Sequence, residues 1–363
     1  MRQSVTVPRG RLRFAFAGYV LKLLSLLPAQ LRRKMLRTHV DAPIPAFPDY
    51  FQVLRLCDPS VHFGWAAVPG AVQQEFARLA AVEVVDLSIE TTAAIVPMRL
   101  YRDPALPASA ALLWIHGGGF TGGGLDCAEA HWVALELAAQ GIPVLTMTYR
   151  KALDGVTFPA PSDDVLKAWD WAVAHADRLG VRPEQIHIGG GSAGGNLSAG
   201  VTKRLRDQGR QLPASLVMVY PLLHSALPKL APDDEAFCKS RVKAFADADF
   251  VLAVCLNYVG DPAALADPYA FPGLGSLHGL PPVLIVNAQF DSLRGSGEAF
   301  AARLAADGGT VSCQCETGAL HGYLMMPSSP FAHATIARML GWLKDADRTP
   351  AGAPSSKGIP GID

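Results

Sequence analysis

The chain has 363 residues, of which half are hydrophobic and 18% are charged. This length and apolar content predict a large α/β domain with a sizeable buried core, plus an appendage. The 32 basic and 32 acidic side chains balance to a formal charge of zero, so there is no electrostatic case for nucleic acid as a partner.

Residues 1–80 carry helical patterns that are interrupted by a proline-rich stretch at 42–48. An apolar run at 14–27 has arginines on both sides, but Lys22 interrupts it and it is too short to span a bilayer. No clear cleavage site of a secretory leader follows. The pattern favours an amphipathic helix that covers another part of the protein. Contact with a membrane surface and a cleaved leader are the alternatives, and neither is favoured.

From residue 82 the pattern becomes one of strands. The segments 82–89 and 94–101 alternate as an antiparallel pair does. Further strands are predicted at 112–115, 144–149, 186–188, 216–220, 283–288 and 311–316, and helices at 129–139, 163–179, 196–206, 296–307 and 331–344. Such alternation predicts a mostly parallel central sheet with helices on both faces.

Three other parts of the chain complete the predicted domain organisation. An irregular insertion at 222–282 has its own helix near 247–258, and the tail at 348–363 is rich in Pro, Gly and Ser and is predicted to be disordered. The α/β domain then spans 81–347.

The six cysteines are scattered and suggest neither a disulfide framework nor a metal site, so reduced thiols and a cytoplasmic location are expected.

The segment 190–194, called the elbow below, reads G-G-S-A-G and fits the G-x-S-x-G pattern. This pattern places a serine in a strained bend between a strand and a helix, with its hydroxyl projecting from the sheet. The flanks agree, because a short β-prone segment precedes Ser192 and a proline-free helical segment follows it. The pattern also arises by chance in a chain with 34 glycines, so its weight depends on its partners.

A nucleophilic serine needs a base, a group that orients the base, and donors for an oxyanion. Asp291 follows the strand at 283–288 and His321 follows the strand at 311–316. Both are therefore expected at the carboxyl ends of parallel strands, the edge from which Ser192 emerges. The order Ser, Asp, His is also the order associated with this elbow. A helix N-cap for Asp291 and an ordinary loop position for His321 are the alternatives.

The segment 116–120, called the glycine loop below, reads H-G-G-G-F and follows a predicted strand. Its three glycines would expose successive backbone N–H groups to a ligand, and the N–H of Ala193 at the start of the next helix would add another. A phosphate-binding loop is the competing interpretation, which is disfavoured because no G-K-[ST] follows. His116 is interpreted as a residue that braces the loop.

The glycine loop and the elbow together resemble the hormone-sensitive-lipase-like (bacterial family IV) esterases of the α/β-hydrolase fold. The resemblance extends from about residue 82 to 344 and includes Tyr149-Arg150, Tyr220-Pro221 and His321-Gly322-Tyr323. It implies Ser192 as nucleophile, His321 as base and Asp291 as the orienting acid. It implies oxyanion donors from Gly118, Gly119 and Ala193. It also implies a helical cap formed largely by residues 1–80, to which the insertion at 222–282 can contribute.

The chain departs from the pattern of this family at three places. Gly191 stands where the family usually has Asp, or Thr in one subgroup. Lys151-Ala152-Leu153-Asp154 replaces an apolar-Ala-Pro-Glu run, and Gly295-Ser296-Gly297 follows the acid where Asp-Glu-Gly is common. None of these changes removes a member of the predicted triad, but they leave open how the elbow is hydrogen-bonded.

The resemblance implies a serine carboxylesterase that acts on a small-molecule ester of short or medium acyl chain, with no metal or organic cofactor. Phe120, Trp132 and Tyr323 are near the predicted catalytic loops and are candidates for the acyl pocket, with core packing as the alternative for each. A homodimer is an open alternative, because dimers are frequent in the family. The rival functions are a membrane-associated lipid hydrolase and a binding protein on a hydrolase scaffold, and the presence of His321 disfavours the latter.

Overall fold

The computed structural model describes residues 79, 81–91, 94–241, 248–327 and 329–345. The predicted cap segment at 1–80, apart from Leu79, and the predicted tail at 348–363 lie outside the described residues. The disfavoured alternative, contact of the N-terminus with a membrane, falls on the same undescribed segment. In the described part of the chain, no helix is both long and apolar enough to cross a bilayer.

The centre of the molecule is one twisted sheet whose strands run in the order β1-β2-β4-β3-β5-β6-β7-β8. The strands are β1 (Glu83–Glu90), β2 (Ile95–Arg102), β3 (Ala111–Ile115), β4 (Val144–Met147), β5 (Ile186–Gly191), β6 (Leu216–Val219), β7 (Val283–Phe290) and β8 (Val311–Leu320). β2 pairs antiparallel with β1 and β4, and every pair from β4 to β8 is parallel. The predicted mostly parallel α/β fold is therefore confirmed.

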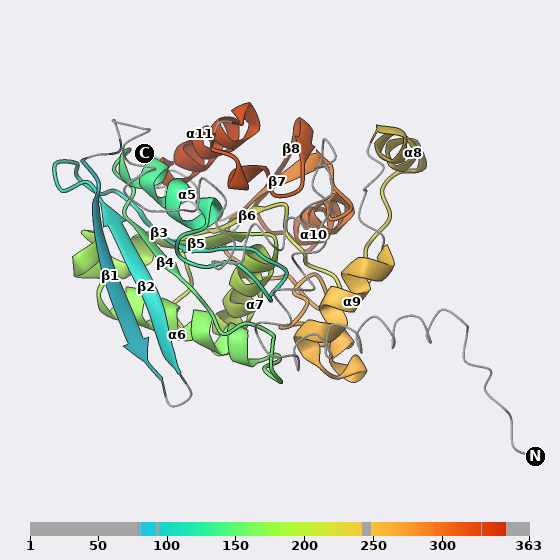
Figure 1. Ribbon diagram of the computed structural model, residues 1–363, viewed down its shortest axis with the longest axis horizontal. Helices are drawn as coiled ribbons and strands as arrows, with labels where there is room; N and C mark the ends of the chain where they lie inside the picture. The colour runs from blue at the N-terminus through green and yellow to red at the C-terminus, as the bar shows by residue number, and fades with distance from the viewer. Residues whose placement is uncertain (1–78, 80, 92–93, 242–247, 328, 346–363) are drawn as a thin grey trace, which may run out of the picture.

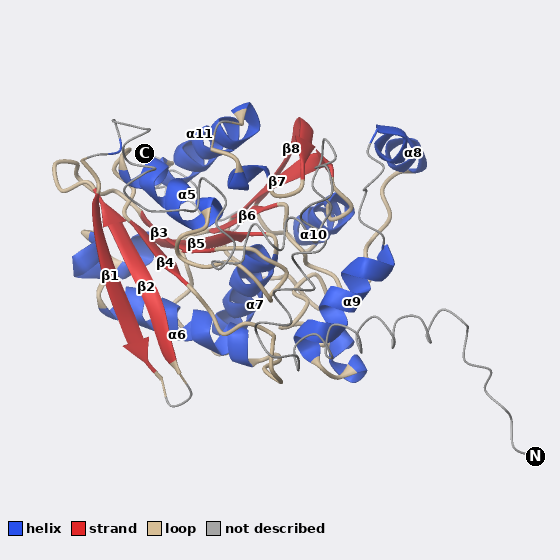
Figure 2. Cartoon of the chain, in the orientation of Figure 1, coloured by secondary structure: helices blue, strands red, loops and turns tan. Residues whose placement is uncertain are grey.

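Helices cover both faces of this sheet (Figure 2). The helices α5 (Ala128–Ala138) and α11 (Pro330–Lys344) share one buried apolar cluster on one face. The helices α6 (Ala160–Ala174), α7 (Ala193–Asp207) and α10 (Arg294–Ala306) contribute to a second cluster on the other face. Because both faces are covered, β3, β5 and β6 are buried along their whole length, which explains their continuous apolar or glycine-rich sequences.

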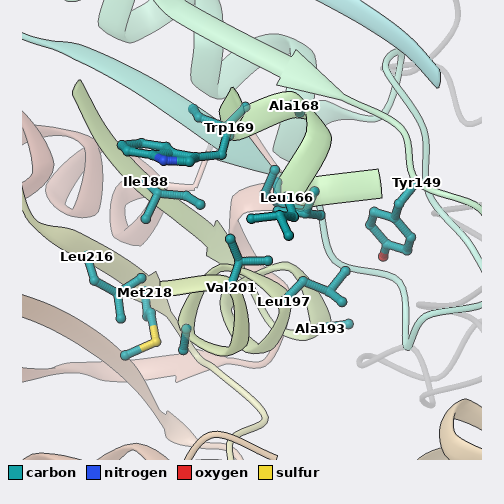
Figure 3. Packing of buried hydrophobic residues seen from close by; sticks show 14 of the residues in the cluster. Tyr149, Leu166, Ala168, Trp169, Ile188, Ala193, Leu197, Val201, Leu216 and Met218 are labelled. Carbon is teal, nitrogen blue, oxygen red and sulfur yellow. The ribbon is translucent and has the colours of Figure 1, made fainter. Parts of the chain in front are cut away.

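The packing of α7 fixes the position of the elbow. Figure 3 shows Leu197 and Val201 of α7 pointing toward Leu166 of α6 and Ile188 of β5, and all four side chains belong to the same buried cluster. Burying aliphatic side chains of this size stabilises a fold by about 1.5–3 kcal/mol each. The helix that follows Ser192 is therefore anchored by its apolar face, and its first residue is held against the end of β5.

In the described residues, the insertion between β6 and β7 contains two α-helices, α8 (Pro232–Arg241) and α9 (Ala248–Val259), and a 3-10 turn at Pro262–Ala266. The helix predicted near 247–258 is α9, whereas α8 was not predicted. Its start has a proline and three acidic residues in the first turn, as helix starts often do, but it lacks an apolar stripe. Tertiary contacts hold α8 instead: Arg294 pairs with Asp234 at 2.8 Å, and Cys238 Sγ lies 3.2 Å from the carbonyl oxygen of Gln289.

One predicted helix is divided in the structure. The segment 163–179 consists of α6, which begins earlier at Ala160, and a separate 3-10 turn at Ala176–Leu179. The break falls at His175, whose backbone leaves helical geometry at φ −122° and ψ 35°. The ring of His175 stacks on Trp171 and its Nδ1 lies 2.8 Å from the Trp171 carbonyl, so side-chain contacts accompany the end of the helix.

Candidate active site

The elbow holds Ser192 in an unusual backbone conformation. Ser192 follows the last residue of β5 and precedes α7, with φ 52° and ψ −117°. A positive φ costs a residue with a side chain about 1–3 kcal/mol, so the surrounding structure has to enforce it. The Ser192 N–H donates to the carbonyl of Val219 at 2.9 Å. A Cβ at Gly194 would overlap the carbonyl oxygen of Ile115, so only glycine lets α7 approach β3 this closely.

Three polar side chains from the carboxyl ends of three strands meet at this elbow. The Nε2 atom of His321 lies 3.0 Å from Ser192 Oγ, and its Nδ1 atom lies 2.7 Å from Asp291 Oδ2. Asp291 follows β7 directly, and His321 follows β8 directly. The second oxygen of Asp291 accepts the N–H of Leu293 at 2.9 Å, so this carboxylate also braces the turn before α10.

The electrostatic surroundings suit His321 to accept a proton. Burial lowers the pKa of His321, but the charge of Asp291, the hydrogen bond to that carboxylate and the charge of Glu129 outweigh burial, and the pKa is raised. Since Nδ1–H donates to Asp291, the lone pair of Nε2 is directed at the Ser192 hydroxyl. The arrangement can therefore take a proton from Ser192 and stabilise the resulting imidazolium.

The glycine loop lies beside the Ser192 hydroxyl. A Cβ at Gly117 would be 3.1 Å from Ser192 Cβ, so the loop and the elbow are in direct contact. Gly118 and Gly119 have φ of 110° and 58°, and within the described residues their N–H groups donate to no other group. Ala193 is the first residue of α7, where the N–H lacks a helical acceptor. These N–H groups can bind an oxyanion that develops at the serine.

His116 braces the glycine loop, as interpreted from the sequence. Its Nδ1 atom lies 2.7 Å from the Gly117 carbonyl oxygen and donates to it, and its Nε2 atom accepts from Lys151 Nζ at 3.0 Å. The ring stacks on Tyr149 with centroids 4.7 Å apart. Burial, and then the charge of Lys151, hold the pKa of His116 well below its ordinary value. A neutral His116 is thus locked by contacts on both nitrogens.

Two buried residues join this site that sequence reasoning did not assign to it. Glu129, in the first turn of α5, accepts hydrogen bonds from the Gly117 N–H and, at 2.6 Å, from the Tyr220 hydroxyl. The ring of Tyr220 lies 4.8 Å from that of His321. The signal available in the sequence was weak: one acidic residue near the start of a largely apolar helix, twelve positions after Gly117. Burial raises the pKa of Glu129, against the effect of these hydrogen bonds and of His321.

The three aromatic candidates for the acyl pocket are all fully buried. Phe120 is the last residue of the glycine loop, has φ 64°, and stacks on Tyr258 of α9 with centroids 3.8 Å apart. Trp132 packs edge-on against His333 of α11. The hydroxyl of Tyr323 lies 2.7 Å from Thr335 Oγ1, and the ring belongs to the same core cluster as Trp132. Of the three candidates, only Phe120 thus lies in the glycine loop, and the positions of the other two favour the core alternative.

In the part of the chain that the structure describes, the remaining titratable groups form no candidate metal site. Among the described residues, no cluster of three or more His, Cys, Asp or Glu side chains is placed to hold a metal ion. The cysteines of this part of the chain are free: Cys127, Cys238, Cys255, Cys313 and Cys315.

Comparisons with known proteins agree with this geometry. A family model described as the alpha/beta hydrolase fold matches residues 112–325. Ethyl acetate hydrolase of Pseudomonas putida is 34% identical over 258 residues, which cover 68% of this chain and 77% of that protein. Carboxylesterase NlhH of Mycobacterium tuberculosis is 33% identical over 237 residues, 63% of this chain and 71% of that one. The hyperthermophilic esterase of Pyrobaculum calidifontis has a TM-score of 0.67 at 25% identity, covering 88% of this chain and 98% of its own.

Proposed function

Because this chain belongs to the hormone-sensitive-lipase-like family of α/β hydrolases and is a carboxylic ester hydrolase, we propose that it works through a triad of Ser192, His321 and Asp291. The observation that carries the proposal is the pair of contacts made by one imidazole, 3.0 Å to the serine oxygen and 2.7 Å to the aspartate. A base in contact with both a nucleophile and an orienting acid is the arrangement that acyl transfer requires.

In the first half of the reaction, Ser192 Oγ attacks the ester carbonyl carbon while its proton passes to Nε2 of His321. The carbonyl oxygen becomes an oxyanion, for which the N–H groups of Gly118, Gly119 and Ala193 are the proposed donors. Loss of one such donor typically lowers the rate by about 10²–10³. The bond to the leaving oxygen then breaks as the imidazolium gives its proton to the departing alcohol, which leaves an acyl-serine.

In the second half, His321 takes a proton from a water molecule as the water oxygen attacks the acyl carbon. The second tetrahedral oxyanion collapses, the proton on His321 returns to Ser192 Oγ, and the carboxylic acid is released. Asp291 keeps the imidazole in the required orientation and offsets its positive charge in both halves. Each step uses only side chains and N–H groups of this chain together with water.

We propose short- to medium-chain esters as the substrates. One curated relative is named for its action on ethyl acetate, a small ester. In this chain, Phe120 of the glycine loop stacks on Tyr258, and both rings are fully buried, which favours a closed apolar wall at this loop. We further propose that residues 1–80 form most of the cap over this site and that the protein acts in the cytoplasm. A homodimer is an alternative to the monomer.

The test is hydrolysis of p-nitrophenyl esters from acetate to palmitate by the wild type and by Ser192→Ala. We expect activity that is highest on short acyl chains and absent in the variant. Activity that peaks on the longest, dispersed esters would instead favour the membrane-associated lipid hydrolase. A wild type that binds small esters tightly without turnover would favour the binding protein, and activity that survives in Ser192→Ala would overturn the triad.

A further inference from the structure

The position before the nucleophile carries no side chain, yet its space is filled. Gly191 stands where a family with this elbow usually has Asp or Thr. A Cβ built on Gly191 would overlap Oε1 of Glu129 and would lie 3.2 Å from Cε2 of Tyr220. The volume that a side chain at 191 would occupy is therefore taken by a carboxylate that arrives from α5, on a separate part of the chain.

This carboxylate contacts two parts of the catalytic site. Glu129 is only 2% exposed, and its two oxygens have different partners. Oε2 accepts the N–H of Gly117, the residue whose backbone lies against Ser192. Oε1 accepts the hydroxyl of Tyr220 at 2.6 Å, and the ring of Tyr220 lies against His321. One buried acid thus connects the glycine loop with the wall that supports the catalytic base.

We propose that Glu129 is a positioning residue for ester hydrolysis, which supplies from α5 the acid that the elbow lacks at position 191. The proposal rests on the proposed function of the triad. Glu129 holds the start of the glycine loop so that the N–H groups of Gly118 and Gly119 face Ser192. It also holds Tyr220 against the imidazole. Because a buried carboxylate close to a histidine favours the charged imidazolium, Glu129 adds to the effect of Asp291 on His321.

The titratable groups around these two side chains come from several elements. His321 faces Asp291 after β7, Tyr220 after β6 and the charge of Glu129 on α5. Glu129 faces Tyr220, the charge of His321 and the buried thiol of Cys127. Among them, Asp291 and Glu129 are the groups that raise the pKa of His321. Removing the charge of Glu129 should therefore lower that pKa while leaving the direct contact with Asp291 in place.

The first test compares Glu129→Gln with a matched control, Asp126→Asn. Asp126 precedes the same helix, and its carboxylate pairs with Arg99 of β2 at 2.8 Å rather than with a member of the triad. In Glu129→Gln we expect kcat to fall roughly 10- to 100-fold, less than the ~10²–10³ of a lost oxyanion donor, with a smaller change in KM. The acidic limb of the pH profile of kcat/KM should move to lower pH, because the base stays neutral further into acid. The control should keep the wild-type limb.

An acidic limb that stays at the wild-type pH, with kcat unchanged, would overturn the role of Glu129. A residue that merely packs the core would lower stability without moving the limb, so thermal unfolding is followed in parallel. These outcomes differ from a failure of the proposed function, which would appear in the wild type as hydrolysis that does not depend on Ser192.

The second test moves the acidic side chain from position 129 to position 191. Gly191→Asp alone should remove most activity, because the new side chain overlaps Glu129 and brings two carboxylates together. Glu129→Ala alone should lose activity through the freed Gly117 N–H. In the double variant the new aspartate enters the vacated space, and we expect at least about tenfold more activity than in either single variant, a coupling that independent sites do not show. Effects of the two substitutions that simply multiply would overturn the proposal.

Discussion

The chemistry of Ser192 depends on residues far from it in the sequence. The proposed base, His321, is 129 positions away, and the proposed orienting acid, Asp291, lies 30 positions before that base in the chain. The backbone of Ser192 is strained, and the hydrogen bond from its N–H to Val219 couples that strain to β6. The hydroxyl is thus presented by contacts that only the complete sheet provides, so a short peptide with the same motif would have no reason to adopt this bend.

At the residue scale, Asp291→Asn should remove the negative charge beside His321 while it keeps the size of the side chain. The amide keeps the shape of the side chain but cannot hold the charged imidazole, and in a comparable serine triad the same change lowers kcat by about 10⁴. We expect a loss of that order with little change in thermal unfolding. The neighbouring variant Ser292→Ala is the control, because the buried hydroxyl of Ser292 has no hydrogen-bond partner among the described residues. Its removal should be nearly neutral for activity and stability.

An equal loss in the two variants would contradict this role for Asp291, since it would point to local packing near the end of β7. A large loss of stability in Asp291→Asn would also do so. In that case the bond from the Leu293 N–H to Asp291, which braces the turn before α10, would be the main contribution of this carboxylate.

At the scale of elements, the approach of α7 to β3 decides where the elbow lies. A Cβ at Gly194 would overlap the Ile115 carbonyl oxygen and would lie 2.7 Å from the His116 carbonyl oxygen. Gly194→Ala should therefore push the start of α7 away from the glycine loop. We expect a loss of about 1–3 kcal/mol in the free energy of unfolding, and a fall in kcat because Ala193 and Ser192 move with the helix.

Gly341→Ala is the matched control for this prediction, since the same substitution is made inside a helix without the clash. Gly341 lies in α11, and a Cβ there would meet nothing within 4 Å. Alanine is favoured over glycine in helices by about 0.8–1.0 kcal/mol, so this variant should be more stable and equally active. Chemical denaturation of both variants gives the comparison, and a Gly194→Ala protein as stable as the wild type would contradict the close approach.

The elements themselves could be predicted where a local pattern determined them. The strands and most helices were found because continuous apolar strands and 3.6-residue periodicity are local signals. The split after α6 was missed because His175 ends the helix through contacts with Trp171 that leave no gap in the apolar pattern. The polar helix α8 was missed because the interactions that hold it, such as the pair of Arg294 with Asp234, come from distant parts of the chain.

At the scale of the whole molecule, the topology explains which parts of the site could be predicted. Ser192, Asp291 and His321 each follow a parallel strand, and such strands end at one edge of the sheet, so their meeting followed from their order. The role of Glu129 could not be predicted in this way. Its carboxylate fills a space left by a glycine 62 positions later, and only the packing of α5 against the sheet brings the two together.

The pH dependence of the whole protein follows from the raised pKa of His321. The proposed base acts when neutral, so activity should rise with pH through a pKa above the ordinary value of about 6.5. Stability should change in the opposite direction. A histidine whose folded pKa is raised stabilises the fold fully below its unfolded pKa, and this contribution is lost as pH rises through the folded value. Between the two pKa values, the enzyme should therefore gain activity while it loses stability.

This prediction is checked by urea unfolding of the wild type and His321→Gln at several pH values from about 5.5 to 8.5, the range that spans the ordinary histidine pKa. The difference in unfolding free energy should be largest at the acidic end and should shrink as pH rises. Ser192→Ala is the control, because it removes activity but leaves both groups of the His321–Asp291 pair. It should therefore keep the pH dependence of the wild type. A difference that grows with pH would mean that burial, rather than Asp291, governs the protonation of His321.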